Sequence, residues 1–166
     1  MYRKLKDFIN DWTQESESTL KVFNNLTDES LTKKVNENVR TVGRLAWHIT
    51  SSVGEMAHRT GLTFKSVDEN SSVPNTAKEI VEAYKNDSEN MIAEIKEKWN
   101  DETLLAVDDM YGEKWKRGNT LKVLINHQIH HRGQLTVVMR LNGLKVPGIY
   151  GPSKEEWANY GMPAQV

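Results

Sequence analysis

The sequence contains no cysteine, which excludes disulfides, zinc sites with cysteine ligands, iron–sulfur clusters and a cysteine nucleophile. It also lacks an excess of charge, because 22 Lys and Arg oppose 23 Asp and Glu and the formal net charge is -1. This balance gives no electrostatic reason to expect nucleic acid or an anionic membrane as a partner. No apolar run approaches the roughly 18 residues of a membrane span, and the first residues show no secretory hydrophobic segment.

The composition is typical of a folded chain. Of the 166 residues, 37% are hydrophobic and 27% are charged, and there are only 4 prolines, which together argue against disorder. The length suits one compact domain with a sizeable core. We therefore expect residues 1–166 to form a single domain that resides in the cytoplasm.

Apolar residues recur at steps of three and four in four stretches, which is the spacing of one face of an α-helix. These stretches cover residues 5–26, 42–56, 77–95 and 121–138. None of them is hydrophobic all round, so each is expected to bury one stripe in a shared core. The pattern predicts an all-α fold, a four-helix bundle.

The connections between the stripes differ in character. Residues 63–74 carry Ser, Asp, Asn and Pro without periodicity and predict a long loop, and long loops often border binding sites. Residues 102–118 fit no helical period and contain two glycines, which predicts an irregular or hairpin-like connection before the last long helix. That helix is predicted to begin at Asn119 or Thr120 and to end before Asn142 and Gly143.

Two histidines of the fourth stripe, His127 and His131, carry the strongest chemical signal. Four helical residues advance about 400° and rise about 6 Å, so both imidazoles project from one face and can converge on one ion. We expect both rings inside the apolar stripe, where an unsatisfied polar group costs about 1–3 kcal/mol. The same spacing binds zinc in metalloproteases, although the glutamate that follows the first histidine there is missing here.

His48 is the natural third ligand, because it borders the inward face of the second stripe. Three histidines from two helices, with water in a fourth position, form an open metal site of the catalytic kind. Such an ion lowers the pKa of a bound water or thiol and polarises the substrate. Imidazole suits Zn, Ni, Fe and Cu, so these residues do not select the metal. The alternative is a structural bundle whose histidines only hydrogen-bond one another.

Other polar residues lie near these three. Gln134 lies on the same side of its helix as His131, where it would orient a bound water or substrate or fill a polar corner. Glu55, two turns beyond His48, is either a fourth ligand, an acceptor behind the ligands, or a solvated side chain. His130 lies about 100° around the helix and is expected in solvent or at an interface. There is no glycine-rich phosphate loop and no nucleophile elbow.

Three segments together carry a family resemblance. Residues 126–135 contain the pattern His-x-x-x-His-Arg-Gly-Gln, residues 42–49 end in His-Ile, and residues 146–153 read Val-Pro-Gly-Ile-Tyr-Gly-Pro-Ser and are followed by Glu156 and Trp157. In this combination, which covers nearly the whole chain, the sequence resembles the DinB family of the DinB/YfiT-like superfamily.

This resemblance implies a four-helix bundle with a three-histidine site for a divalent metal, zinc or nickel, and a homodimer. The positions that match the family's metal ligands are His48, His127 and His131. Characterised relatives in the superfamily include thiol-dependent transferases and a thiol-dependent isomerase. The family name reflects induction by DNA damage and implies no polymerase activity.

The resemblance therefore predicts a metal-dependent transferase or hydrolase that acts on a small-molecule substrate, with a low-molecular-weight thiol or water as the activated group. The alternative is a non-catalytic stress-response protein that binds a metal or a small ligand.

Overall fold

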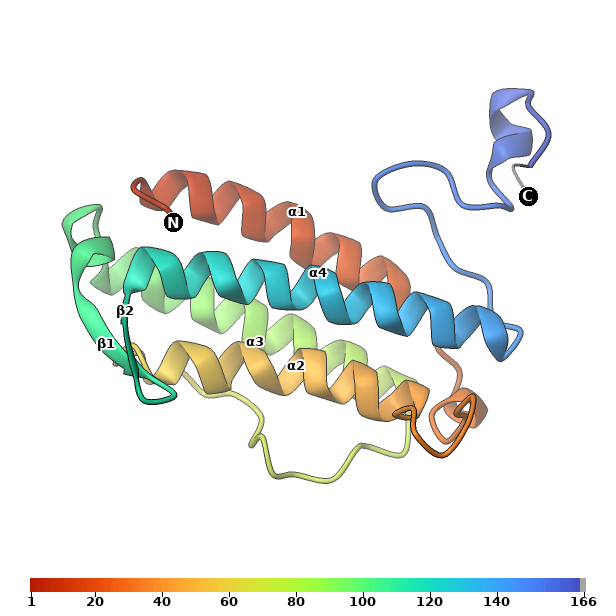
Figure 1. The fold of residues 1–166 in the computed structure, drawn as a ribbon, viewed down its shortest axis with the longest axis horizontal. Coiled ribbons are helices and arrows are strands. Elements are labelled where there is room, and N and C mark those ends of the chain that lie inside the picture. Colours follow the sequence, from red (N-terminus) through yellow and green to blue (C-terminus); the bar gives the residue numbers. More distant parts are fainter. Residues whose placement is uncertain (165–166) are drawn as a thin grey trace.

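The computed structural model describes residues 1–164 and confirms the all-α fold, a four-helix bundle (Figure 1). The helices are α1 (Leu5–Phe23), α2 (Val42–His58), α3 (Ala77–Lys98) and α4 (Arg117–Leu141). Helices α1 and α2 each pack against both α3 and α4. None of the helices within residues 1–164 is both long enough and apolar enough to cross a membrane.

The second connection crosses the length of the bundle. Helices α2 and α3 run in the same direction, and α1 and α4 run in the opposite one (Figure 1). Residues 59–76 must therefore return from the end of α2 to the start of α3, along the outside of the helices. The loop predicted at residues 63–74 lies in this crossover, which has no helix or strand of its own.

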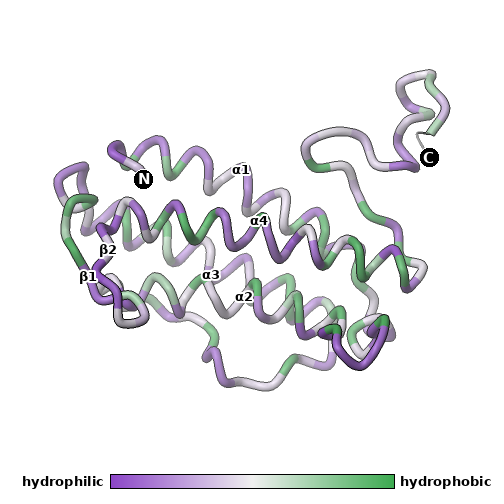
Figure 2. Tube along the Cα trace, viewed as in Figure 1, coloured by the Kyte–Doolittle hydropathy of each residue, from purple (hydrophilic) through white to green (hydrophobic). Residues whose placement is uncertain are grey.

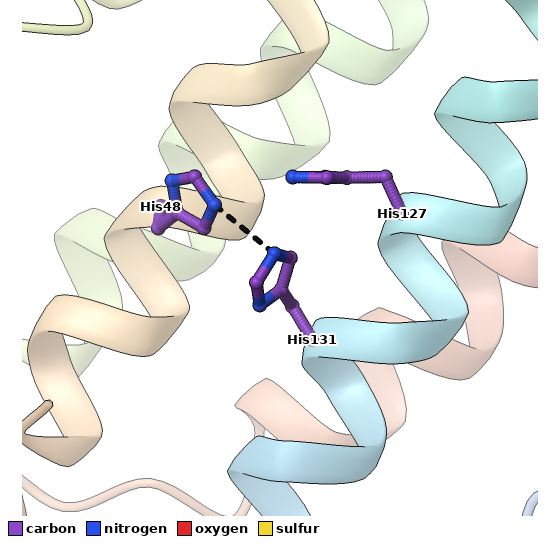
Figure 3. Close-up of side chains that lie close together, drawn as sticks. All are labelled: His48, His127 and His131. Atoms are coloured by element: carbon purple, nitrogen blue, oxygen red, sulfur yellow. Dashed lines mark hydrogen bonds between the residues drawn. The ribbon is translucent and has the colours of Figure 1, made fainter. Parts of the chain in front are cut away.

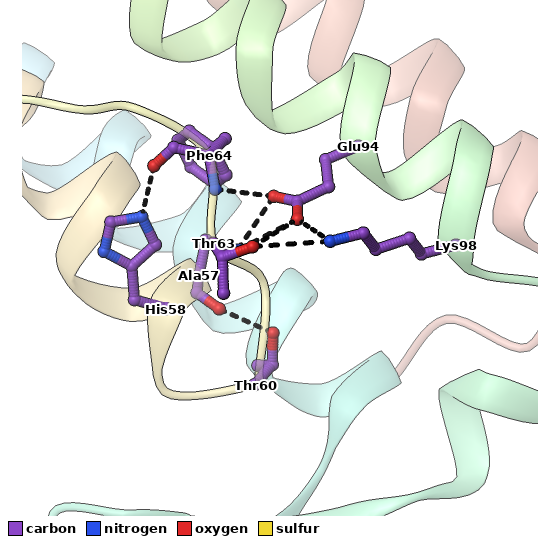
Figure 4. Close-up of polar contacts among 7 residues, drawn as sticks. All are labelled: Ala57, His58, Thr60, Thr63, Phe64, Glu94 and Lys98. Atoms are coloured by element: carbon purple, nitrogen blue, oxygen red, sulfur yellow. Dashed lines mark hydrogen bonds and ion pairs between the residues drawn. The ribbon is translucent and has the colours of Figure 1, made fainter.

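Buried acidic side chains of α3 hold the crossover in place, and Figure 4 shows one of them, Glu94. The carboxylate of Glu94 accepts hydrogen bonds of 2.7–3.0 Å from the backbone N–H groups of residues 63–64 and also pairs with Lys98. Burial alone would raise the pKa of Glu94, but these contacts outweigh it and hold the pKa at about 2. About two turns earlier on α3, the buried Asp87 accepts from the backbone N–H of Val67 at 3.0 Å, and burial raises its pKa to about 6.

The helix starts follow local chemistry in two cases. Thr76 and Glu79 form the capping box typical of an α-helix N-terminus, with each side chain accepting from the other residue's backbone N–H at 3.2 Å. Thr41 caps α2 by accepting from the backbone N–H of Arg44 at 3.1 Å. Both helices thus begin where a side-chain oxygen satisfies an otherwise unpaired amide.

Helix α4 begins at Arg117, before the predicted Asn119 or Thr120. The reason is the hairpin that precedes it, because the Arg117 backbone N–H donates to a carbonyl at the hairpin's start and its guanidinium pairs with Asp108. The helix ends at Leu141, as predicted, and Gly143 follows with a φ of 81°.

The hairpin-like connection is confirmed. Strands β1 (Val107–Met110) and β2 (Glu113–Lys116) pair antiparallel, and Tyr111 and Gly112 form the turn with φ values of 60° and 86°. A two-residue turn with both φ values positive matches the twist of the strands. Short 3₁₀ turns lie at η1 (Asp28–Ser30), η2 (Glu102–Leu105) and η3 (Trp157–Tyr160).

The core face of α4 differs from the prediction. Gln128 and Arg132 are buried, whereas His127 and His131 are only half-buried and Gln134 is exposed. Polar and apolar residues intermix along this helix (Figure 2), so its apolar stripe alone did not define the buried face. The two histidines border the core instead of lying within it.

A polar network makes the burial of Arg132 tolerable. Its guanidinium forms an ion pair of 2.5 Å with Glu15 of α1 and also donates to the Glu15 carbonyl and the Thr19 hydroxyl. The Tyr150 hydroxyl lies 2.7 Å from the guanidinium and donates to the same carboxylate at 2.8 Å. These contacts tie α1, α4 and the segment after α4 together.

Candidate metal centre

Three imidazoles meet between α2 and α4 (Figure 3). His48 comes from α2, and His127 and His131 lie one turn apart on α4. The Nε2 atoms of His48 and His131 are 3.2 Å apart, and one nitrogen from each of the three rings lies within 4.8 Å of the others. The sequence prediction that these rings converge is therefore met, and the group could hold a metal ion.

The spacing suits a cation. A tetrahedral zinc ion with Zn–N bonds of about 2.0–2.1 Å separates two ligand nitrogens by about 3.3 Å, close to the separation of the His48 and His131 Nε2 atoms. A hydrogen bond between these two rings would also fit that distance. It would leave His127 outside the pair, however, and the Nδ1 atom of that ring is buried without a hydrogen-bond partner among residues 1–164.

The rings are in the protonation state that metal ligation requires. Burial, with smaller contributions from neighbouring charges, lowers the pKa of His48 and of His127 to about 4. Burial also lowers the pKa of His131. All three imidazoles are thus neutral at pH 7 and have a lone pair available for a cation.

Gln134 orients one of the three rings. Its Oε1 atom lies 2.8 Å from Nδ1 of His131, and its Nε2 atom lies 3.0 Å from a ring nitrogen of His130. This arrangement places the His131 proton on Nδ1, so that the lone pair of Nε2 faces His48. His130 is exposed, as expected. The sequence placed Gln134 near the site but did not reveal its contact with His131.

Glu55 is not part of the cluster. Its carboxylate accepts from the Tyr111 hydroxyl at 2.6 Å and from Nε of Arg59 at 2.5 Å. The Arg59 guanidinium also lies over the Tyr111 ring, 4.4 Å from its centroid. These contacts fasten the hairpin turn to α2, so Glu55 stabilises the fold near the site.

A pocket of about 590 Å³ opens beside the cluster, and His131 and Gln134 form part of its wall. The other wall comes from the segment before α2, including Arg40, whose positive charge contributes to lowering the pKa of all three histidines. Sequence reasoning missed Arg40. The available signal was its place immediately before the cap of the helix that carries His48.

Comparison with known proteins agrees with this architecture. The sequence model of the DinB family matches residues 1–165. The uncharacterized protein YrdA of Bacillus subtilis (strain 168) is 42% identical over 164 residues, which cover 99% of this chain and 98% of that protein.

Solved structures show the same relationship. A DinB-like protein from Bacillus cereus ATCC 10987 superposes with a TM-score of 0.87 at 39% identity, covering 90% of this chain and all of that one (100%). The DinB-like protein YjoA of Bacillus subtilis has a TM-score of 0.66 at 18% identity over 86% of this chain and 97% of its own, and so shares the fold. The chain described here belongs to the DinB family.

Proposed function

We propose that this protein is a metal-dependent enzyme in which His48, His127 and His131 bind one divalent cation, zinc or nickel. The observation that supports the proposal most directly is the convergence of three neutral imidazoles, two of them with Nε2 atoms 3.2 Å apart, beside an open pocket. Three protein ligands leave room for an exogenous group, as in catalytic rather than structural sites.

The proposed reaction is the transfer of a low-molecular-weight thiol to an electrophilic small molecule. The sulfur forms a bond to the electrophilic carbon, the thiol proton passes to solvent, and the group displaced from that carbon leaves with the electron pair of its bond. When bound, the cation supplies Lewis acidity, which lowers the pKa of a thiol or a water beside it. The residues of the chain position the reactants: Gln134 fixes the tautomer of His131, and the neighbouring pocket holds the electrophile. Water in place of the thiol would give hydrolysis with the same residues. We favour the thiol because the characterised relatives in the superfamily that this sequence resembles include thiol-dependent transferases.

The alternative is a homodimeric cytoplasmic protein that binds a metal or a small ligand under stress without turnover. One observation favours it: among residues 1–164, no carboxylate joins the three histidines, and Glu55 is engaged with Tyr111 and Arg59. The site thus has no evident carboxylate base, which a metal-assisted hydrolase would commonly employ.

The first experiment measures metal content. Protein purified without an affinity tag is expected to hold about one divalent ion per chain, and His127→Ala is expected to lose it. His58→Ala is the matched control, because His58 is exposed, bonds the Phe64 carbonyl at 2.9 Å and lies outside the cluster. The metal site would be refuted by a wild type that contains no metal and is no less stable than after incubation with the metal. Full metal content in His127→Ala would also refute it.

The second experiment separates enzyme from binder. Glutathione-like and bacillithiol-like thiols are offered together with electrophilic acceptors, and consumption of the thiol is followed with and without protein. Turnover that disappears in His131→Ala and persists in His58→Ala supports the enzyme. Metal binding with neither transfer of a thiol to any acceptor nor hydrolysis of any acceptor supports the binding protein.

A further inference from the structure

The pocket beside the histidine cluster has an unusual lining for a protein surface. The final turns of α4 present Val137 and Leu141 with 58% and 65% of their surface exposed, and Val35 opposite them is 43% exposed. Surface helices ordinarily turn such residues toward the core. A patch of exposed apolar side chains around a concavity is typical of a binding site.

Among residues 1–164, Arg40 is the one charged side chain in the lining of the pocket, and no acidic residue lines it. Within residues 1–164, no hydrogen bond or ion pair engages the Arg40 side chain. Its charge lies close to the cluster, because Arg40 and His131 line the same pocket. A lone guanidinium at the edge of an apolar pocket is complementary to a single carboxylate or sulfonate, which it binds with two parallel hydrogen bonds.

We propose that this pocket binds a small monoanion with an apolar body, with Arg40 pairing with the anionic group and Val137 and Leu141 contacting the body. The volume of about 590 Å³ lies within the usual range for small-molecule sites. Because His131 forms part of the wall, the bound molecule reaches the histidine cluster. The inference rests on the proposed function, for which it names the class of the electrophilic substrate.

The test uses a pair of fluorescent probes that share one aromatic body. Anilinonaphthalene sulfonate carries a single negative charge, and N-phenyl-naphthylamine is the same skeleton without the sulfonate. Arg40→Gln is expected to weaken the affinity for the sulfonate probe at least about fivefold and to change the affinity for the neutral probe by less than about twofold. Val137→Asp, which places a carboxylate in the lining, is expected to weaken both probes.

Arg44→Gln is the matched control, because Arg44 is an exposed arginine in the first turn of α2 that does not line the pocket. An equal loss in Arg44→Gln, or an unchanged sulfonate affinity in Arg40→Gln, overturns the proposal. Sedimentation velocity tests the competing occupant, a second copy of the chain. The proposal is also overturned if the wild type is a dimer that binds neither probe and Val137→Asp is a monomer that binds them.

The same preparations keep the two proposals apart. Metal content is measured in each variant, and Arg40→Gln is expected to retain the wild-type amount because Arg40 is not a ligand. Arg40-dependent sulfonate binding in a metal-free wild type would support the pocket and refute the metal centre. A metal-loaded protein that binds both probes regardless of Arg40 would refute the pocket alone.

Discussion

Replacing Arg132 with methionine tests whether the buried ion pair between α1 and α4 stabilises the bundle. The Arg132 and Glu15 side chains are only 3% and 13% exposed, and their charged atoms are 2.5 Å apart. Methionine keeps much of the apolar stem but removes the charge and every donor. The Glu15 carboxylate would then be left at the protein interior with the Tyr150 hydroxyl as its remaining side-chain partner.

The expected loss is about 3 kcal/mol of unfolding free energy. Removing one partner of a buried pair costs about 3–5 kcal/mol, because the other charge stays buried and unpaired. The lower end applies here because Glu15 keeps some contact with water and its bond from Tyr150. For a chain of this length, 1 kcal/mol shifts Tm by about 2–4 °C, so the expected shift is roughly 6–12 °C.

Urea denaturation followed by circular dichroism measures this loss, provided that the slope with urea is unchanged. The double variant Glu15→Gln, Arg132→Met should be less destabilised than the sum of the two single variants, since the second change removes the unpaired charge. Arg140→Met is the control, because Arg140 and Glu155 form an exposed pair and its loss should matter little. A loss below about 1 kcal/mol in Arg132→Met, or one equal to that of the control, would refute the reasoning.

Three further predictions concern the site and its surroundings. Gln134→Leu removes the acceptor of the His131 Nδ1 proton and should weaken metal affinity about 10–100-fold in a competitive chelator titration, with Thr136→Val as the control. Asp87→Asn should stabilise the protein more at pH 7.5 than at pH 4.5. Burial raises the pKa of Asp87 from 3.8 to about 6, so the folded state keeps a proton that the unfolded state loses, and the stability of the wild type falls as the pH rises from about 4 to about 6. Equal effects of the substitution at both pH values would contradict this. Gly133→Ala should raise the unfolding free energy by about 0.5–1 kcal/mol, because a Cβ there meets no atom within 4 Å and alanine favours the helix; a lower melting temperature would count against it.

Features that depend on neighbours in the chain were predictable. The helical stripes, the capping box at Thr76 and Glu79, and the hairpin before α4 follow from local spacing and backbone chemistry. The pairing of His127 with His131 belongs to the same class, because four residues of any α-helix bring two side chains to one face. The glycine at position 133 of α4 is not required by a neighbouring helix within residues 1–164, because a Cβ built there meets no atom within 4 Å.

Features that depend on contacts between distant segments could not be predicted from the sequence. The burial of Arg132 escaped the hydrophobic pattern because its partner Glu15 lies 117 residues away, and only the packing of α1 on α4 brings the two charges together. The pocket beside the histidine cluster escaped it for the same reason, since its lining residues Arg40 and Leu141 are about a hundred residues apart in the chain.

By itself, the sequence determined which segments become helices and which histidines share a helix face, because periodicity and capping act over a few residues. Tertiary structure decided that His48 lies within coordinating distance of the other two, that α2 and α3 run in parallel, and which side of α4 is buried. Those outcomes depend on how helices rotate and pack against each other, and a buried charge or amide can join a core whenever a distant segment supplies its partner.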